Sequence, residues 1–483
     1  MSRIVIIGSG VAGLSAGITA RLNGDEAVIL EKHTIPGGNL TGWDRGGYHV
    51  DNCIHWLTGT NPLTKTYEMW EKLGAIDRDS IRYPETLYTY EKDGRSVSLY
   101  DDSERLRRRM IELSPADERE TERFIRAVRA AESLCGVDPK DGGKKCAAYR
   151  GVLRSPALAP YYFMTAGGLA GRFRDPLLRG FLSEFLTENF GALGLIFVFA
   201  TFCSKNGGIP RGSSRDMAKR MADRFVSLGG KLLTGAQVER INVKGGSARS
   251  VTLRCGGTIR ADYVVPACDP AAVFGKMIGG EYMPRPLKRR FESPSYFRFS
   301  SCHAAFSFAG RVPFRGDLIL DLPEAGRGGM KAKTVVLREY SREGSFAPPG
   351  RGIIQTMFFC DEDESERFVS LGRDSKEYAE EKEKIGGRMR DVVLSRFPEL
   401  SPSLEELDVW TPATYNGFTA SEAGTYMAFA FSSRTVPSFM KGRVRGLDNV
   451  VLATQWQRAP GGLPNAALAG VRAAECISAI ERK

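Results

Sequence analysis

Three glycines near the N-terminus have the spacing of a phosphate-binding turn. Gly8, Gly10 and Gly13 follow an apolar run at residues 3–7 and precede a segment whose apolar residues recur at helical intervals. Glycine permits a tight turn at the first position, approach of a pyrophosphate to the backbone at the second, and close helix–strand packing at the third. The amino end of the following helix would face the phosphates, and its dipole would stabilise their charge.

A carboxylate at the end of the second apolar run strengthens this interpretation. Glu31 closes the run AVILE about 20 residues beyond the turn, where a carboxylate accepts hydrogen bonds from both hydroxyls of an adenosine ribose. Its charge would repel a 2′-phosphate, which disfavours NADP. Gly37 and Gly38 then bring a second stretch of bare backbone near the dinucleotide. A glycine turn alone is weak evidence, but this combination predicts a dinucleotide-binding α/β fold.

The segments that follow resemble one family. The glycine doublet resembles that of the FAD-binding amine oxidase and phytoene desaturase superfamily rather than that of nicotinamide-dependent dehydrogenases. Further segments occur in the order expected of phytoene desaturase-like proteins, a group that includes carotenoid desaturases, carotenoid isomerases and retinol saturases. The resemblance extends over most of the chain, and these segments are 46–59, 207–241, 261–270 and 450–470.

The resemblance implies FAD as the cofactor, and no metal site is expected. Asn39 stands where relatives usually carry a basic residue, and Thr454 stands where they commonly carry glycine. A helix that begins near Gly462 would point its amino end at the flavin and favour negative charge on the reduced ring. The residues implied to contact FAD or to shape its site are Gly8, Gly10, Ala12, Gly13, Glu31, Lys32, Gly37, Gly38, Asn39, Leu40, Val238, Gln455, Gly461, Gly462, Leu463 and Ala466.

The fold class implied is α/β: a Rossmann-like FAD-binding domain of the glutathione-reductase type with a discontinuous α+β substrate domain. Helical periodicity between 102 and 200 and alternating patterns between 295 and 360 predict a sheet covered by helices in the second domain. The FAD-binding domain is expected at 1–75, 207–275 and 440–483, and the substrate domain at 76–206 and 276–439.

An unusually aromatic segment lies in the expected substrate domain. Its apolar run at 191–203 is shorter than the roughly 20 residues that span a bilayer, so we interpret it as a buried helix or a wall next to lipid. The aromatic residues serve either core packing or an apolar tunnel that leads to the flavin. They are Phe181, Phe185, Phe190, Phe197 and Phe199.

Few residues are candidates for proton transfer. The chain has four histidines, and neither paired carboxylates nor a nucleophile triad is evident, as is acceptable when the flavin carries the hydride step. His55 could reach the flavin, but a histidine satisfied within the core is the alternative. The segment 409–429 resembles the family's stretch beside the substrate, where Thr411, Pro412 and Tyr415 match and a frequent arginine is absent. Tyr415 could transfer a proton or serve only for shape.

Composition limits the partners and the compartment. The 483 residues carry a net charge of +11, but the two signs are interspersed, which argues against nucleic acid and leaves peripheral contact with an anionic membrane as a minority interpretation. Nine cysteines without a CxxC pair and the absence of a signal peptide favour the cytoplasm, with association at a membrane surface as an option. A second dinucleotide motif is not found, so an external electron partner is needed, such as NAD(P)H, a quinone or oxygen.

We therefore favour an FAD-dependent oxidoreductase that desaturates, saturates or isomerises carbon–carbon bonds of a hydrophobic isoprenoid-, steroid- or lipid-like substrate by hydride transfer at flavin N5. A flavin amine oxidase on the same fold is one alternative, and it would need an aromatic pair facing the flavin and a polar cavity. A binder of lipidated partners of the GDP-dissociation-inhibitor type is the other. The intact glycine segments argue against that non-catalytic class.

Overall fold

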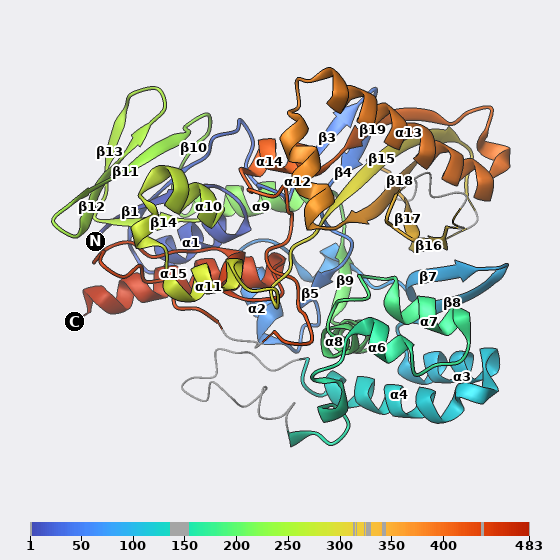
Figure 1. Cartoon of the computed structure of the whole chain (residues 1–483). Helices are drawn as coiled ribbons and strands as arrows, with labels where there is room; N and C mark the ends of the chain where they lie inside the picture. Colours follow the sequence, from blue (N-terminus) through green and yellow to red (C-terminus); the bar gives the residue numbers. More distant parts are fainter. Residues whose placement is uncertain are drawn as a thin grey trace.

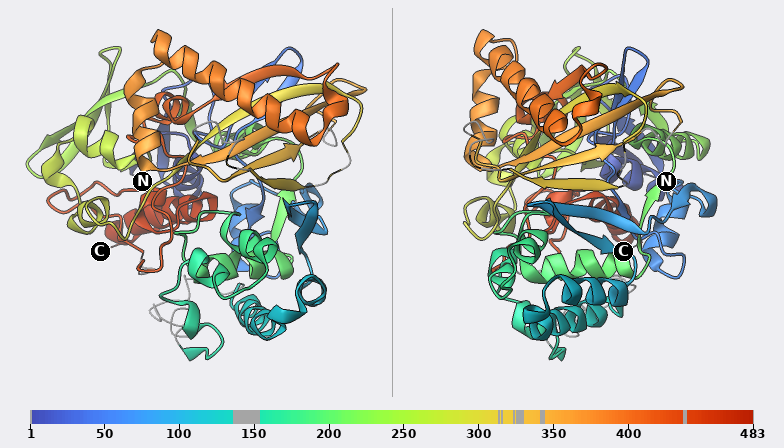
Figure 2. Two further views of the ribbon diagram at one scale, coloured as in Figure 1. Left: turned by 45° about the vertical axis from the view of Figure 1, so that its right-hand side comes forward. Right: turned by 90° about the vertical axis from the view of Figure 1, so that its right-hand side faces the viewer.

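Two groups of elements lie side by side in the protein (Figure 1), and the left view of Figure 2 shows them from another direction. One group is built on a parallel sheet and holds both ends of the chain, and the other is built on a long mixed sheet. The structure is a computed structural model that describes residues 2–135, 154–312, 314, 316–322, 324, 330–340, 344–435 and 439–482.

A four-stranded parallel sheet forms the centre of the first group. In sheet order its strands are β10 (Lys231–Leu233), β2 (Glu26–Leu30), β1 (Arg3–Ile7) and β14 (Tyr263–Pro266). The apolar residues of β1 and β2 are buried, as expected of a parallel sheet that helices cover on both faces. The covering helices include α1 (Val11–Leu22), α9 (Ser214–Ser227) and α15 (Leu463–Glu481).

Smaller elements complete this group. An antiparallel sheet consists of β11 (Val238–Lys244), β12 (Ser247–Leu253) and β13 (Thr258–Arg260). The short strands of this group are β5 (Leu57–Thr58), β6 (Ile81–Arg82) and β9 (Gly207–Pro210). The hairpin of β3 (Gly42–Arg45) and β4 (Tyr48–Asp51) instead packs against the mixed sheet of the second group (Figure 1). The short helices are α2 (Lys65–Lys72), α10 (Pro270–Ala272) and α11 (Arg285–Phe291).

A mixed sheet of seven strands forms the second group. In sheet order the strands are β19 (Glu405–Trp410), β15 (Ser300–Ala309), β18 (Arg351–Cys360), β17 (Thr334–Glu339), β16 (Asp317–Asp321), β7 (Thr86–Lys92) and β8 (Arg95–Tyr100). Strands β16 and β7 pair in parallel, and the other neighbours pair antiparallel. Residues far apart in the sequence therefore meet on one sheet.

Alternation gives this sheet two different faces. Even-numbered residues of β15, such as Phe306, pack with α12 (Glu362–Leu371) and α13 (Lys376–Arg396) in one apolar cluster. Odd-numbered residues, such as His303, point to the opposite face because successive side chains alternate along a strand. That second face bounds the cavity that holds the candidate site.

Helices form a further layer beside β7 and β8 (Figure 2). They are α3 (Ser103–Leu113), α4 (Glu118–Glu132), α6 (Ala166–Ala170), α7 (Pro176–Ser183) and α8 (Ala192–Cys203), and α14 (Pro412–Thr419) lies beside β15. The apolar run at 191–203 is thus a largely buried helix. Across the described ranges, none of the helices combines the length and the apolarity needed to cross a bilayer.

The prediction of a mixed α/β fold is confirmed, as are helices in the described part of 102–200 and strands between 295 and 360. The seven strands of the mixed sheet come from 86–100 and 300–410, within the expected substrate segments. The boundaries of the two domains stay a prediction. Cys146 lies outside the described residues, and the other eight cysteines are free thiols.

Candidate active site

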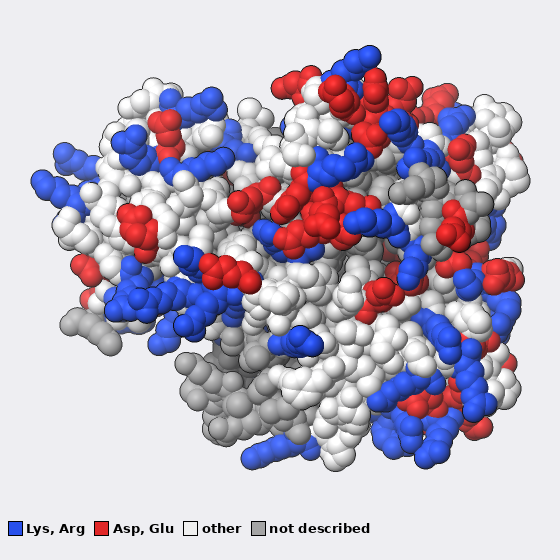
Figure 3. Space-filling model, in the orientation of Figure 1, with Lys and Arg blue, Asp and Glu red and all other residues white. Residues whose placement is uncertain are grey.

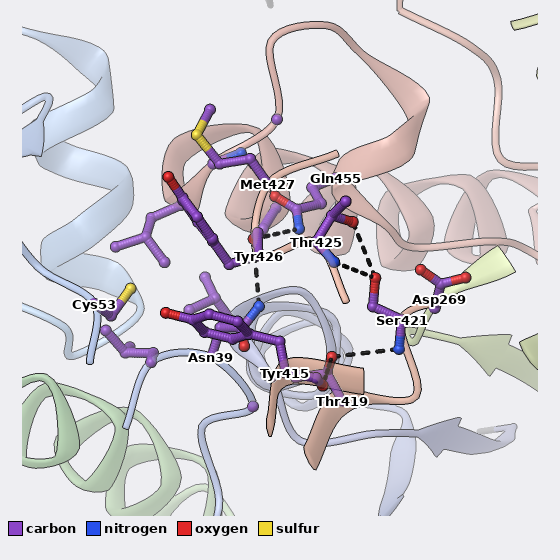
Figure 4. A pocket seen from close by; sticks show the side chains of 18 of the residues that line it. Asn39, Cys53, Asp269, Tyr415, Thr419, Ser421, Thr425, Tyr426, Met427 and Gln455 are labelled. Carbon is purple, nitrogen blue, oxygen red and sulfur yellow. Dashed lines mark hydrogen bonds between the residues drawn. The ribbon is translucent and has the colours of Figure 1, made fainter. Parts of the chain in front are cut away.

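One cavity of about 840 Å³ is lined by residues from both groups of elements. Its lining includes the glycine turn after β1, the segment before α15 and the odd-numbered face of the mixed sheet. Figure 4 shows Tyr415, Tyr426, Met427 and Gln455 around part of this space. All the residues predicted for the cofactor line this cavity except Gly13, which lies inside α1.

Bare backbone forms the cavity wall at the glycine turn. Gly8 has a φ of +98°, a left-handed conformation that favours glycine. Gly10 and Gly37 form a parallel β-bridge, and a Cβ on Gly38 would lie 3.3 Å from the Cα of Gly10, so the two glycine segments touch. Helix α1 begins after Gly10 without a side-chain cap, which leaves its first N–H groups to an anionic ligand.

Glu31 is fixed at the edge of this wall. Its Oε2 accepts hydrogen bonds from the N and Oγ of Ser9 at 2.8 and 2.7 Å, and its Oε1 accepts one from the N of His33 at 2.9 Å. A carboxylate has about four lone-pair sites, so capacity remains for the hydroxyls of a ribose. Beside it, the Nζ of Lys32 donates to the carbonyl of Gly417 at 3.0 Å, and burial lowers the pKa of Lys32.

Asn39 connects the glycine-lined part of the cavity to the segment that contains Tyr426. Its Nδ2 donates to the carbonyl oxygen of Tyr426 at 3.3 Å, and its Oδ1 is buried without a hydrogen-bond partner in the described part of the chain. A buried polar atom left unpaired costs free energy until a ligand satisfies it. The buried side chains of Leu40 and Val238 add apolar surface to the same side.

Gln455 holds the segment that precedes α15. Its Oε1 accepts a hydrogen bond from the N of Gly462 at 2.7 Å, and its Nε2 donates to the carbonyl of Tyr426 at 3.2 Å. A Cβ on Gly461 would lie 2.6 Å from the N of Ala428, so this position requires glycine. The two chain segments at the cavity are thereby locked together.

The amino end of α15 lines the cavity with uncapped backbone. Gly462 has a φ of +106° and gives no side-chain cap, and Leu463 and Ala466 of the first turns line the space. An anionic edge of a ligand would be stabilised there by the helix dipole. Thr454 has a φ of −144°, an extended conformation that any residue adopts, so the change from glycine at this position needs no strain.

Apolar side chains form the remainder of the cavity. The sheet register aligns Met357 of β18 between His303 of β15 and Val336 of β17, so these three side chains share one face. The segments around α7 and α8 contribute the facing wall. The apolar and aromatic residues on this side are Trp56, Phe185, Leu186, Phe190, Val198, Phe299, Ile319, Val336, Met357, Phe359 and Met427.

Tyr415 and His303 belong to one buried polar group beside this wall. The Tyr415 hydroxyl accepts a hydrogen bond from Trp410 Nε1 at 3.2 Å and lies 3.1 Å from His303 Nε2, which lies 2.6 Å from Ser301 Oγ. The His303 ring also stacks on Trp410, with 4.6 Å between the ring centroids. Burial raises the pKa of Tyr415 and lowers the pKa of His303 well below its usual value, so both groups are neutral near pH 7.

His55 occupies a second polar position in the cavity. Its Nδ1 lies 3.6 Å from Oδ2 of Asp317, and Asp317 accepts two hydrogen bonds from the guanidinium of Arg338. Burial, with a smaller contribution from Arg338, lowers the pKa of His55. The imidazole is therefore neutral at pH 7, and the Asp317–Arg338 pair carries no net charge.

Comparison with known proteins assigns the chain to a family. A family model described as flavin-containing amine oxidoreductase matches residues 11–478. The chain belongs to this family. Prolycopene isomerase 1 of an Oncidium hybrid cultivar is 26% identical over 452 residues, which cover 87% of this chain and 74% of the relative. Phytoene dehydrogenase of Streptomyces griseus is 23% identical over 503 residues, which cover 99% and 95%.

Solved structures share the fold along the whole chain. An oxidoreductase from Methanosarcina mazei matches with a TM-score of 0.61 and 16% identity, covering 99% of this chain and 100% of that one. Putrescine oxidase bound to putrescine matches with a TM-score of 0.59 and 15% identity, covering 99% of both. At this identity the likeness establishes the fold and not the substrate.

Membership of this family makes the protein an FAD-dependent oxidoreductase. Its relatives confirm the resemblance to carotenoid desaturases and isomerases. The cavity suits FAD for three reasons. The amino ends of α1 and α15 line it without side-chain caps, glycine backbone forms part of its wall, and Glu31 lies directly after β2. The contacts of individual residues with FAD stay predictions.

The aromatic segment divides between two roles. Phe185 and Phe190 line the cavity, whereas Phe181 and Phe199 are fully buried in the core and Phe197 packs against that core away from the cavity. The tunnel interpretation is therefore wrong for three of the five residues. The three core residues lie on α7 and α8 and face the packed side of these helices, whereas Phe185 and Phe190 lie in the non-helical segment between the two helices, where helical periodicity does not apply.

Sequence reasoning missed four residues of the polar positions: His303, Asp317, Arg338 and Gln355. Strand pairing brings them onto one sheet from four strands, β15, β16, β17 and β18, which no local motif encodes. A signal was nevertheless present, because Asp317 directly precedes the apolar run at 318–320 and Arg338 directly follows the apolar run at 335–337. Such charges are expected to be paired when the strand is buried.

Proposed function

We propose that this enzyme adds, removes or moves a carbon–carbon double bond in a hydrophobic isoprenoid-, steroid- or lipid-like molecule. The observation that supports this best is the apolar wall opposite the FAD cradle, to which the segment between α7 and α8, α8 itself and the mixed sheet all contribute. Burial of apolar surface stabilises a bound molecule by roughly 25 cal/mol per Å² before the costs of association. Relatives named for phytoene and prolycopene point to the same class of substrate.

In this proposal the residues of the chain bind the substrate, orient it against the cofactor and exclude water from the site. When bound, FAD supplies the acceptor or donor of a hydride at N5. The amino end of α15 would favour negative charge at one edge of the cofactor, and the wall with Phe185 and Met357 would hold the reacting carbons in place. Tyr415 and His303 bring hydrogen-bonding capacity without charge.

The direction of the reaction depends on a partner outside the chain. The same groups serve desaturation and saturation. The redox potential of an external donor or acceptor, such as NAD(P)H, a quinone or oxygen, determines in which direction the reaction runs.

We also propose that an apolar substrate enters from a membrane surface or a carrier. Leu63 and Phe163 expose 94% and 80% of their surface, while charges of both signs are mixed over the face in Figure 3, with a basic group over α11.

One observation favours amine oxidation as a second candidate. Tyr415 and Tyr426 both line the cavity, with ring centroids 5.5 Å apart and planes inclined by 43°. An aromatic pair beside the flavin is a feature that the amine oxidase hypothesis requires. The surrounding wall is mainly apolar, however, so we place amine oxidation second to the reaction on an apolar substrate.

Anaerobic stopped-flow spectroscopy of the FAD-loaded enzyme distinguishes the two candidates. Oxidised and photoreduced enzyme are mixed in turn with polyenes, enones and steroids in detergent, and with primary amines and amino acids. We expect an apolar compound to reduce or reoxidise the flavin and amines to have no effect. Rapid reduction by an amine together with indifference to every apolar compound would reverse the order of the candidates.

A further inference from the structure

The cavity face of the mixed sheet consists of an apolar row and a polar row. Met357, Val336 and Ile319 stand next to one another on β18, β17 and β16. Two residues along each strand, Gln355, Arg338 and Asp317 form the next row, which lies about 7 Å away on the same face. One end of the apolar wall is therefore polar.

The polar row includes a donor that has nothing to bind. Gln355 is 6% exposed, and its Nε2 is buried without a hydrogen-bond partner in the part of the chain that the structure describes. It lines a small void of about 10 Å³ together with Arg338 and His55. Gln355 does not itself line the main cavity, but the void adjoins it, because His55, Val336 and Met357 line both spaces. A buried unpaired amide is costly, so its retention at the end of a binding cavity points to a ligand acceptor.

The charge of this row selects the kind of acceptor. Arg338 is neutralised by Asp317, with which it forms two hydrogen bonds, and the two residues lie opposite each other in the β16–β17 register. A carboxylate placed here would meet the negative Asp317 and also Asp51, which lines the same void and accepts hydrogen bonds from the N and Oγ of Ser214. An ammonium group would meet the positive Arg338. An uncharged oxygen avoids both penalties and can accept from Gln355 and exchange a hydrogen bond with neutral His55.

We infer that Gln355 and His55 form a subsite for an uncharged oxygen function, so that the substrate is an apolar chain with a hydroxyl or carbonyl group at one end rather than a pure hydrocarbon. This inference rests on the proposed function and narrows its substrate class. The subsite binds and orients the substrate end, and it takes no part in the hydride step. Its consequence is that the apolar chain enters in one orientation only.

The test compares three probes on one C20 isoprenoid skeleton: the primary alcohol geranylgeraniol, the matching hydrocarbon without oxygen, and the matching carboxylic acid. Their affinities for the FAD-loaded enzyme are measured in one detergent by titration of the flavin absorbance. We expect the alcohol to bind about tenfold more tightly than either of the others, the scale of one satisfied buried donor. Gln355→Leu should reduce this preference to within about twofold and leave the affinity for the hydrocarbon intact.

Two further variants keep the result interpretable. His55→Leu tests the same subsite from another element, should Gln355→Leu lose FAD or melt early. Gln237→Leu makes the same chemical change beside Val238 in the same cavity and should retain the preference. Equal affinities of all three probes for the parent, or a preference that survives both subsite variants, would overturn the subsite while the proposed function stands. Failure of every isoprenoid probe alongside reduction by amines would overturn the proposed function, and the subsite with it.

Discussion

A Cβ atom on Gly13 would lie 1.9 Å from the carbonyl oxygen of Gly8. The first turn of α1 therefore rests directly on the backbone of the glycine turn, and glycine is required there by packing within the protein. At Gly10 the nearest protein atom to such a Cβ would be the carbonyl oxygen of Gly37 at 3.8 Å. Packing within the protein thus requires glycine at position 13 but not at position 10, where we predict that the ligand requires it.

Substitutions at these glycines should separate stability from FAD binding. Gly13→Ala forces α1 away from the turn and should lower the free energy of unfolding by about 3 kcal/mol, the upper range for overpacking. At position 10 the φ of −63° suits valine, and a Cβ would make only an ordinary van der Waals contact, 3.8 Å from the carbonyl oxygen of Gly37. Gly10→Val should therefore fold normally and lose FAD. Thermal melts and flavin absorbance after gel filtration measure both effects. Normal flavin content in Gly10→Val would remove the pyrophosphate assignment.

Glu31 should contribute to FAD affinity through charge-assisted hydrogen bonds. We expect Glu31→Gln to weaken FAD binding by about 1–3 kcal/mol, a factor of roughly 5 to 150 in the dissociation constant. Glutamine retains an acceptor for Ser9, so the turn should survive. Glu239→Gln, at a more exposed position of the same cavity, is the control and should bind FAD as the parent does. Fluorescence titration of the apoprotein decides, and equal affinities for all three proteins would contradict the ribose assignment.

The sequence was most informative where function requires a local motif. The turn at Gly8 and Gly10, the carboxylate at Glu31 and the helix after Gly462 are contiguous patterns, and the structure brings them to one cavity. The polar row with Asp317 and Arg338 could not be predicted, because its members meet only through strand pairing; these two residues are 21 positions apart in the sequence. The aromatic segment shows a third situation. The sequence identified its phenylalanines but could not predict which of them face the cavity and which face the core.

The carboxyl group of Asp269 should make stability depend on pH. Burial raises the pKa of Asp269 to about 7. Its Oδ1 accepts a hydrogen bond from the N of Ala271 and so caps the amino end of α10. Between about pH 4, the unfolded value, and pH 7 the native protein holds a proton that the unfolded chain has released. The free energy of unfolding should therefore fall as pH rises, by up to about 1.4 kcal/mol per pH unit.

The variant Asp269→Asn keeps an oxygen for the cap and has no proton to hold. The free energy of unfolding of both proteins is measured in urea at several values between pH 4.5 and 6.5. The difference, variant minus parent, should increase as pH rises. The buried His303 acts in the opposite direction below about pH 6.5, but it is present in both proteins and cancels in the difference. Parallel curves would show that Asp269 is ionised in the native protein throughout this range.

Tyr415 should act as a structural anchor of the cavity. Its hydroxyl accepts from Trp410 and faces His303, so Tyr415→Phe leaves buried polar groups unpaired and should cost about 1–3 kcal/mol of stability. Because these bonds occupy the hydroxyl and its pKa is raised by burial, turnover should fall less than tenfold and keep its pH profile. A drop beyond a hundredfold with a changed pH profile would instead assign proton transfer to Tyr415.

Two phenylalanines of the same segment should respond differently to the same substitution. Phe199 is fully buried and meets Phe124 and Phe181 edge-on, with ring centroids 5.3 and 5.5 Å apart, so Phe199→Leu removes core contacts and should cost about 1–3 kcal/mol of stability. Phe185 stacks on Tyr88 at 4.2 Å and lines the cavity, so Phe185→Leu widens the substrate side. The ratio of kcat/KM between a slender and a bulky apolar substrate should therefore change in Phe185→Leu and stay constant in Phe199→Leu. If selectivity shifts equally in both variants, it responds to general loosening of the core, and the wall at Phe185 does not select the substrate.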